Sequence, residues 1–391
     1  MFSSRLPESL APNVLSRTVD RLRAAGATLL DLTATNPTDV GLSYPPNLLQ
    51  SLAAPEGARY APAPLGLPQA REAVAADYAR RRIDAAADRI VLTASTSEAY
   101  ALLFKLLCDP GDAVLVPQPS YPLFDLLTRL DGVAAQPYRL DYHGAWSIDR
   151  ASVEQALTPR TRAMLVVTPN NPTGSMLRQH DREWIAALCA ERGLAVIADE
   201  VFADYPLAPR ADACTFAREQ RMLTFSLGGL SKSAGLPQLK LAWILVDGPE
   251  PLARAALARL DLICDTYLSV STPVQLAAPQ LIAAGAAIRE QIRARLRGNL
   301  ADLRQRLIGT PSVSLLEPEG GWSVVLQVPA TASEDALVAR LLEEARVLVH
   351  PGYFFDFPRE AFLVLSLLPE PGVFGSAVDR LLRVVTGAPA S

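Results

Sequence analysis

Lys232 lies near the middle of Thr224-Phe-Ser-Leu-Gly-Gly-Leu-Ser-Lys-Ser-Ala-Gly-Leu-Pro-Gln-Leu-Lys240, a run of small and apolar residues that ends in a second cation. Burying an ammonium group is costly unless the group is paired or loses its proton. A lysine that attacks a carbonyl carbon must be neutral part of the time, so partial burial would help it. An aldehyde that carries a phosphate would use both Lys232 and Lys240, and pyridoxal phosphate is such a cofactor. A solvated loop lysine explains this stretch equally well when it is taken alone.

Composition limits the classes of function that need to be considered. The chain has 391 residues and a formal net charge of −4, which favours one large and one smaller domain and argues against a nucleic-acid or anionic-membrane partner. No apolar run reaches the length of a membrane span, and the first residues lack the apolar stretch of a signal peptide. The four cysteines form no CxxC pair and the three histidines have no metal-ligand spacing. We therefore expect a cytoplasmic protein with reduced thiols and no metal.

Strand patterns alternate with helix patterns from residue 89 to residue 246. Strands are predicted at residues 89–93, 113–117, 163–167 and 194–198; the first three are each followed by a turn and a helical segment, and the last by Asp199-Glu200. This alternation predicts an α/β domain with a mainly parallel sheet that is covered on both faces. We assign residues 46–285 to this large domain, and residues 1–45 with 286–391 to a small α+β domain. A long arginine-rich helix at 286–307 is expected to bridge the two domains.

Polar side chains follow several of these strands at their carboxyl ends, where open α/β sheets bind ligands. The small-residue turn 95–97 leads into a helix, so its N–H groups could bind a phosphate, although Ser95 or Ser97 could equally be an ordinary helix cap. Asp199 could keep a pyridine nitrogen protonated, and the Asn171 amide could bind a phenolic oxygen. Each of these residues also has an ordinary structural explanation, so their convergence carries more weight than any one of them.

Three motifs resemble, in order and spacing, the class I/II pyridoxal-phosphate-dependent aminotransferases of fold type I. The motifs are Asn171-Pro-Thr-Gly174, Asp199-Glu-Val-Phe202 and Leu230-Ser-Lys-Ser233. The likeness is extended over nearly the whole chain by Tyr60 with Gly66, by Asp109-Pro-Gly-Asp112 and by Pro351-Gly352. It implies a seven-stranded, mainly parallel sheet in the large domain and a homodimer whose active sites lie at the subunit interface. The implied reaction moves an amino group between an amino acid and a 2-oxo acid.

The resemblance also implies roles for individual residues. Lys232 would form the internal aldimine and move the proton, while Asp199 would contact the ring nitrogen. Asn171 would bind the phenolic oxygen, and Tyr121 would stack on the ring. The remaining cofactor-binding residues would be Ser95, Thr96, Ser97, Ser231 and Lys240, with Tyr60 reaching over from the neighbouring subunit.

The chain departs from the family pattern at several positions. Phe202 stands where the family usually has a tyrosine that donates to the phenolic oxygen, and Lys240 replaces a phosphate-binding arginine. Thr35 occupies a position that is often glycine, which would narrow the pocket. Val364 stands where the family normally has the arginine that binds the substrate's α-carboxylate. Arg359 or Arg346 could replace that arginine, or the substrate is not held as an ordinary amino acid.

We expect the substrate to contact Thr35, Asn171 and Arg359, and an apolar, aromatic or unusual substrate is favoured over an acidic one. An aminotransferase is the preferred function. A β- or γ-lyase or synthase on the same fold is the alternative, and it would form product without a keto-acid acceptor. A non-catalytic ligand-sensing protein is less favoured, because the lysine is present and no DNA-binding segment is fused to the chain. A nicotinamide dehydrogenase is disfavoured because no G-x-G-x-x-G motif follows a strand.

Overall fold

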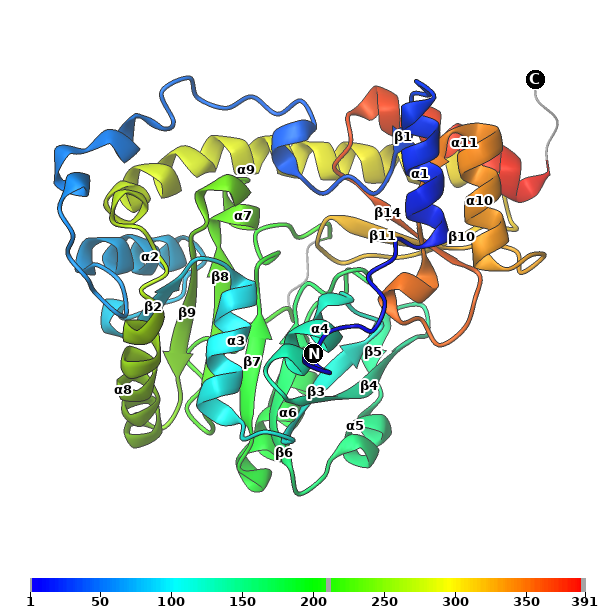
Figure 1. Cartoon of the computed structure of the whole chain (residues 1–391). Helices are drawn as coiled ribbons and strands as arrows, with labels where there is room; N and C mark the ends of the chain where they lie inside the picture. The colour runs from blue at the N-terminus through cyan, green and yellow to red at the C-terminus, as the bar shows by residue number, and fades with distance from the viewer. Residues whose placement is uncertain (1, 209–211, 388–391) are drawn as a thin grey trace.

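A computed structural model describes residues 2–208 and 212–387, and its centre is a large twisted sheet with two smaller sheets at one end (Figure 1). The order of the strands in the large sheet is β2-β9-β8-β7-β6-β3-β4-β5. Their bounds are β2 (Ile90–Thr93), β3 (Ala113–Gln118), β4 (Ala134–Tyr142), β5 (Trp146–Ile148), β6 (Thr161–Val167), β7 (Ala195–Asp199), β8 (Thr224–Gly229) and β9 (Ala242–Asp247). The pairs β4–β3, β3–β6, β6–β7 and β7–β8 are parallel, whereas β9 runs antiparallel to both β2 and β8. The expected mainly parallel sheet is thus confirmed, with one strand more than seven because β5 pairs antiparallel with β4 at the edge.

Helices cover both faces of this sheet, which explains why its central strands are continuous apolar runs. Successive residues of one strand pack in different cores: Leu165 of β6 faces α3 and α8, and Met164 faces α6. The helices of the large domain are α2 (Pro68–Arg80), α3 (Thr96–Leu107), α4 (Leu123–Leu130), α5 (Arg150–Ala156), α6 (Gln179–Arg192), α7 (Leu230–Ser233) and α8 (Glu250–Tyr267). Both layers are needed to bury the strands, so the sheet's carboxyl edge is the part left open to a ligand.

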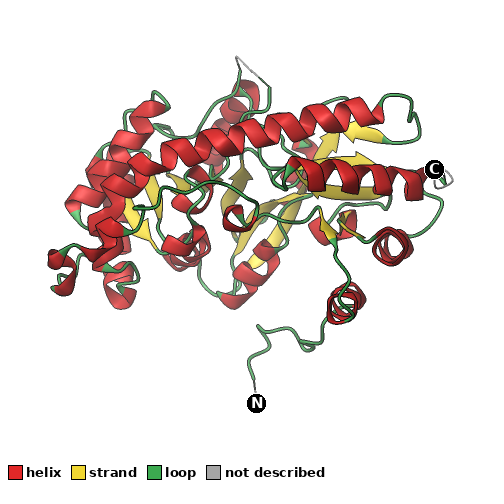
Figure 2. Ribbon diagram, turned by 90° about the horizontal axis from the view of Figure 1, so that it is seen from above, coloured by secondary structure: helices red, strands yellow, loops and turns green. Residues whose placement is uncertain are grey.

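The longest helix, α9 (Thr272–Leu307), is continuous over 36 residues and crosses the molecule from one end to the other (Figure 2). It packs against α2 near its start and against α11 (Pro371–Thr386) in its C-terminal part. The expected bridging helix is therefore confirmed, and it begins before residue 286. The division of the chain into domains at residue 285 falls inside this helix and stays a prediction.

The small domain combines the two ends of the described chain. β10 (Ser314–Leu316), β11 (Ser323–Gln327), β14 (Phe362–Ser366) and β13 (His350–Pro351) form an antiparallel sheet in that order. β1 (Leu30–Asp31) pairs in parallel with β12 (Val347–Leu348), so an early segment is joined to the C-terminal part. The helices α1 (Val14–Ala24), α10 (Glu334–Ala345) and α11 pack around these strands.

Short 3-10 segments connect many of the elements; they are η1 (Pro37–Asp39), η2 (Gln50–Ala53), η3 (Pro55–Ala58), η4 (Ala87–Arg89), η5 (Pro237–Leu239) and η6 (Gly352–Phe355). Within residues 2–208 and 212–387, none of the helices combines the length and the apolar character that a membrane span requires. The same residues contain no group of three or more His, Cys, Asp or Glu side chains that could hold a metal ion.

Candidate active site

A cavity of about 740 Å³ lies between the carboxyl edge of the large sheet and the small-domain strands β11, β13 and β14. Most of the residues expected at the site line this one cavity. They are Thr35, Ser95, Thr96, Ser97, Tyr121, Asn171, Asp199, Ser231, Lys232 and Lys240. The tertiary structure therefore brings together side chains from segments that are up to about two hundred residues apart. Their individual roles stay predictions.

Lys232 lies on α7, the single helical turn that directly follows β8. Its Nζ lies over two aromatic rings, 4.8 Å from the centre of Trp322 and 5.5 Å from the centre of Phe202. None of the carboxylates in the described part of the chain is within ion-pair distance of Nζ. Burial lowers the pKa of Lys232 from 10.5 to about 8, and the negative charge of Asp199 offsets only part of that effect. A useful fraction of neutral amine is therefore present near neutral pH.

Asp199 ends β7 and is buried at the floor of the cavity. Its Oδ2 accepts a hydrogen bond from the Tyr100 hydroxyl at 2.9 Å, and its Oδ1 accepts one from the Val201 backbone N–H at 3.2 Å. Burial raises the pKa of Asp199, while these two hydrogen bonds act against that shift. Burial and the adjacent carboxylate raise the pKa of Tyr100 well above 10, so Tyr100 stays a donor. The sequence analysis missed Tyr100, whose only signal was a position one helical turn after Thr96.

The N-terminus of α3 opens onto the same cavity. Ser95 caps this helix, since its Oγ accepts a hydrogen bond from the Glu98 N–H at 3.1 Å. Glu98 in turn accepts a hydrogen bond at 2.6 Å from the N–H of Ala94, the residue before the cap, so its side chain also folds back over the start of the helix. The cap and an anion site are compatible, because the first N–H groups of a helix have no partner within the helix. Thr96 and Ser97 supply those groups here.

Lys240 follows η5 and reaches the same cavity from a left-handed backbone conformation with φ of 52°. A residue with a Cβ rarely adopts this conformation, which costs about 1 kcal/mol or more. Backbone strain of this kind persists where the surrounding structure holds it, and it commonly accompanies a functional side chain. The second cation of the opening stretch thus lines the same cavity as Lys232, and its role stays a prediction.

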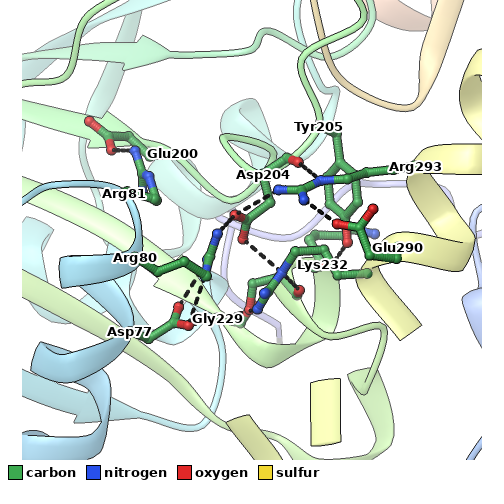
Figure 3. Close-up of polar contacts among 12 residues, drawn as sticks. Asp77, Arg80, Arg81, Glu200, Asp204, Tyr205, Gly229, Lys232, Glu290 and Arg293 are labelled. Atoms are coloured by element: carbon green, nitrogen blue, oxygen red, sulfur yellow. Dashed lines mark hydrogen bonds and ion pairs between the residues drawn. The ribbon is translucent and has the colours of Figure 1, made fainter. Parts of the chain in front are cut away.

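A network of polar side chains contacts the helical turn that contains Lys232 (Figure 3). The Tyr205 hydroxyl donates to the carbonyl oxygen of Lys232, and Nε of Arg289 donates to the carbonyl oxygen of Ser233 at 2.7 Å. Arg289 comes from α9 and is only 4% exposed. These bonds satisfy carbonyl oxygens at the C-terminal end of α7, where no further helical turn exists to donate N–H groups to them.

The same network contains charged groups from three elements. Asp204 lies 2.6 Å from Arg80 of α2, 3.5 Å from Arg289 and 3.7 Å from Arg293 of α9. Asp77 of α2 lies 3.2 Å from Arg80 and 3.8 Å from Arg289. The sequence analysis missed this cluster, because arginines spaced along helices also fit an exposed, solvated helix face.

Three of the residues considered for the site in the sequence analysis do not line this cavity. The Arg359 guanidinium lies 5.4 Å from the centre of the Phe362 ring and is not among the lining residues, so its position gives no support to a substrate contact. Arg346 directly follows α10, and its Nη1 donates to the Leu342 carbonyl oxygen. Tyr60 is 76% exposed and lines a separate hollow. Val364 does line the cavity, so a valine lies where the sequence analysis expected the family's arginine.

A model of the family described as aminotransferase class I and II matches residues 29–370. An alanine aminotransferase of Mycobacterium tuberculosis is 28% identical over 377 residues, which cover 92% of this chain and 86% of that protein. A glutamate-pyruvate aminotransferase, AlaA, of Escherichia coli is 26% identical over 379 residues, with 94% and 93% covered. The solved structure of an alanine aminotransferase from Pyrococcus furiosus superposes with a TM-score of 0.89 at 25% identity and covers 99% of this chain and 100% of that one.

Proposed function

The chain belongs to the class I and II aminotransferases, enzymes that move an amino group between an amino acid and a 2-oxo acid, and we propose that it does so with pyridoxal phosphate bound beside Lys232. The observation that carries the proposal is the state of Lys232. It is a partly buried lysine without a carboxylate partner among the described residues, and it faces a cavity large enough for a cofactor and a substrate. A structural lysine in such a place would be paired.

The residues around the cavity fit the chemical groups of pyridoxal phosphate. The Lys232 amine matches the aldehyde, the Asp199 carboxylate matches a protonated ring nitrogen, and the N-terminus of α3 with Lys240 matches the phosphate. Asn171 accepts a hydrogen bond from Ser323 Oγ at 3.3 Å through its Oδ1, which leaves its N–H groups for the phenolic oxygen. When bound, the cofactor supplies an electron sink for the carbanion that forms on the substrate.

The chain's own residues would provide the proton transfer and the environment. Nζ of Lys232, partly neutral near pH 8, is the base that can take the proton from the α-carbon of the substrate. The rings of Trp322 and Phe202 exclude water from that atom and so keep its pKa low. The Tyr100 hydroxyl holds the Asp199 carboxylate in one orientation. Tyr121, 46% exposed at the rim, offers an aromatic face to the cofactor ring.

We further propose a homodimer with shared active sites, located in the cytoplasm. The exposed ring of Tyr60 supports the shared site, because it is free to reach the cavity of a second copy. All four cysteines are unpaired, as is usual for proteins of a reducing compartment. Small-molecule amino acids and 2-oxo acids are the expected partners.

The cavity wall favours an apolar or aromatic amino donor. Leu123, Trp322, Phe354 and Val364 line the space left beside the cofactor groups. The names of the relatives add alanine and glutamate as amino donors, and pyruvate as an acceptor, to the compounds worth testing first.

The experiment that tests the proposal is an absorbance spectrum of the purified protein with added pyridoxal phosphate, followed by amino acids without any acceptor. We expect a yellow band that is lost as the pyridoxamine form appears, and Lys232→Ala should show neither change. Release of ammonia or a keto acid while the yellow band persists would favour the lyase alternative. No yellow band in the unmodified protein would overturn the proposed cofactor.

A further inference from the structure

His350 lines the part of the cavity wall that the small domain contributes. It lies on β13 and is directly opposite Val364 of β14 in the antiparallel register. Side chains of directly opposed residues share one face of a sheet, with Cβ atoms about 5 Å apart. Both residues line the cavity, so His350 is the cross-strand neighbour of the position at which an arginine was expected and a valine is found.

Ring packing fixes the orientation of His350. Its imidazole is stacked on Phe354, with ring centres 4.8 Å apart and an angle of 2° between the planes, and it meets the edge of Phe355 at 5.6 Å. The ring nitrogens form no hydrogen bond with any other residue of 2–208 and 212–387. The imidazole is therefore held by apolar contacts while its polar atoms stay available to a ligand.

The basic side chains of the cavity are few. Among the described lining residues no arginine occurs, and the basic groups are Lys232, Lys240 and His350. The proposed function assigns the first two to the cofactor aldehyde and phosphate. A substrate carboxylate placed against an apolar wall without a cation would lose most of its hydration uncompensated. His350 is the basic group that remains for it.

We propose that His350 binds the carboxylate of the amino acid and of the 2-oxo acid, and takes up one proton from solvent as it does so. This inference rests on the proposed function and assigns the substrate recognition of that same site. No bond other than the new N–H forms, and the resulting imidazolium neutralises the carboxylate charge. In the free enzyme, burial lowers the pKa of His350, so the ring is neutral at neutral pH and gains its proton only with the ligand.

The charged and titratable groups on the elements packed around His350 are compatible with this uptake. Asp31 of β1 acts on the ring directly and favours its protonated form. Glu334 of α10 already accepts hydrogen bonds from the Tyr353 and Phe362 N–H groups. Burial raises the pKa of Tyr353 in η6, and it also raises the pKa of Asp356 just after η6. Lys232 and Lys240 line the same cavity.

Calorimetry on the cofactor-loaded enzyme tests the proposal with two probes of the same shape, 3-phenylpropionate and 3-phenylpropanamide. Titrations at pH 7.5 in two buffers with different ionisation enthalpies report how many protons binding takes up. We expect proton uptake with the carboxylate and none with the amide. The His350→Phe variant keeps the ring that stacks on Phe354, and it should weaken carboxylate binding about tenfold to a hundredfold while leaving amide binding unchanged.

His350→Gln keeps a hydrogen-bond donor but cannot be protonated, so it should bind the carboxylate with intermediate affinity and without proton uptake. His143→Phe, at an exposed turn between β4 and β5, is the matched control and should resemble the unmodified enzyme. Failure of the unmodified enzyme to bind 3-phenylpropionate, absence of proton uptake, or carboxylate affinity within twofold in His350→Phe would each overturn the proposal. Because the yellow band and transamination are scored separately, these outcomes differ from a failure of the proposed function.

Discussion

Replacing Arg289 by methionine should weaken both the fold and the positioning of Lys232. The guanidinium donates to the Ser233 carbonyl oxygen at 2.7 Å, next to Lys232 in the chain, and lies 3.5 Å from Asp204 and 3.8 Å from Asp77. Methionine has a similar length, so it can fill the space without supplying a donor or a charge. The carbonyl oxygen of Ser233 then loses its side-chain donor in a site where Arg289 is 4% exposed.

The magnitude follows from which partners remain. Breaking a buried ion pair costs about 3–5 kcal/mol when one charge is left alone. Here Asp204 keeps its ion pairs with Arg80 at 2.6 Å and Arg293 at 3.7 Å, and Asp77 keeps its ion pair with Arg80 at 3.2 Å. Neither carboxylate is therefore left without a positively charged partner. The lost hydrogen bond from a charged donor is worth about 1.5–3 kcal/mol. We therefore expect a loss of about 2–3 kcal/mol in the free energy of unfolding. A chain of this length has an unfolding entropy of about 0.8 kcal/mol/K, so Tm should fall by about 3 °C.

Catalysis should be affected separately, because the lost bond fixes the turn that carries Lys232. A misplaced base typically costs about tenfold in turnover or more. The measurements are thermal unfolding of the cofactor-loaded enzyme and single-turnover loss of the yellow band with L-alanine and L-phenylalanine. Arg289→Lys keeps the charge and should recover part of both effects. Arg297→Met, an exposed position on the same helix, is the control. The reasoning is refuted if Arg289→Met matches Arg297→Met in both Tm and turnover.

Three further predictions concern the cavity itself. Only the neutral amine attacks an aldehyde, so the rate at which the apoenzyme binds pyridoxal phosphate through Lys232 should rise with pH. The midpoint of that rise should lie near the pKa of about 8. A midpoint near 10.5 would contradict the effect of burial. Asp199→Asn keeps the shape but not the charge, and should lower the single-turnover rate by about 10²-fold or more; a rate within tenfold of the unmodified enzyme would show that the carboxylate is not needed. Val364→Arg should strengthen binding of 3-phenylpropionate in calorimetry and make carboxylate binding independent of His350. It should also lower the free energy of unfolding by about 1–3 kcal/mol, because Val364 is only 2% exposed. An unchanged affinity would mean that the carboxylate lies elsewhere.

Most elements of the large domain could be predicted from the sequence because the local pattern is strong there. The strands of a sheet covered on both faces are continuous apolar runs, and the turns at their carboxyl ends carry small and polar residues. β5 and α8 are among the elements that were missed. β5 has three residues and pairs only with β4 at the edge, so its pattern is too short to recognise. No element was predicted for residues 250–267, where the structure has α8.

The candidate site was predicted in part, and the division has a physical cause. Lys232, Asp199 and Asn171 follow strands of one parallel sheet, and such strands place their carboxyl ends at one edge whatever the rest of the chain does. Arg359 was expected at the cavity from its proximity in the sequence to the β14 strand. The structure instead places its guanidinium over the Phe362 ring, because position along a loop does not fix the direction of a side chain.

The sequence by itself determined the class of fold. It also determined which polar residues follow each strand and that Lys232 lies among small residues. Only the tertiary structure decided what surrounds them. Tyr100 meets Asp199 across 99 positions, Arg289 meets Ser233 across 56, and His350 enters the cavity through its pairing with β14. Burial lowers the pKa of Lys232, and the Trp322 ring that lies against its Nζ belongs to a residue 90 positions further along the chain. Burial depends on which distant segments pack together, and a local pattern of residues contains no record of that packing.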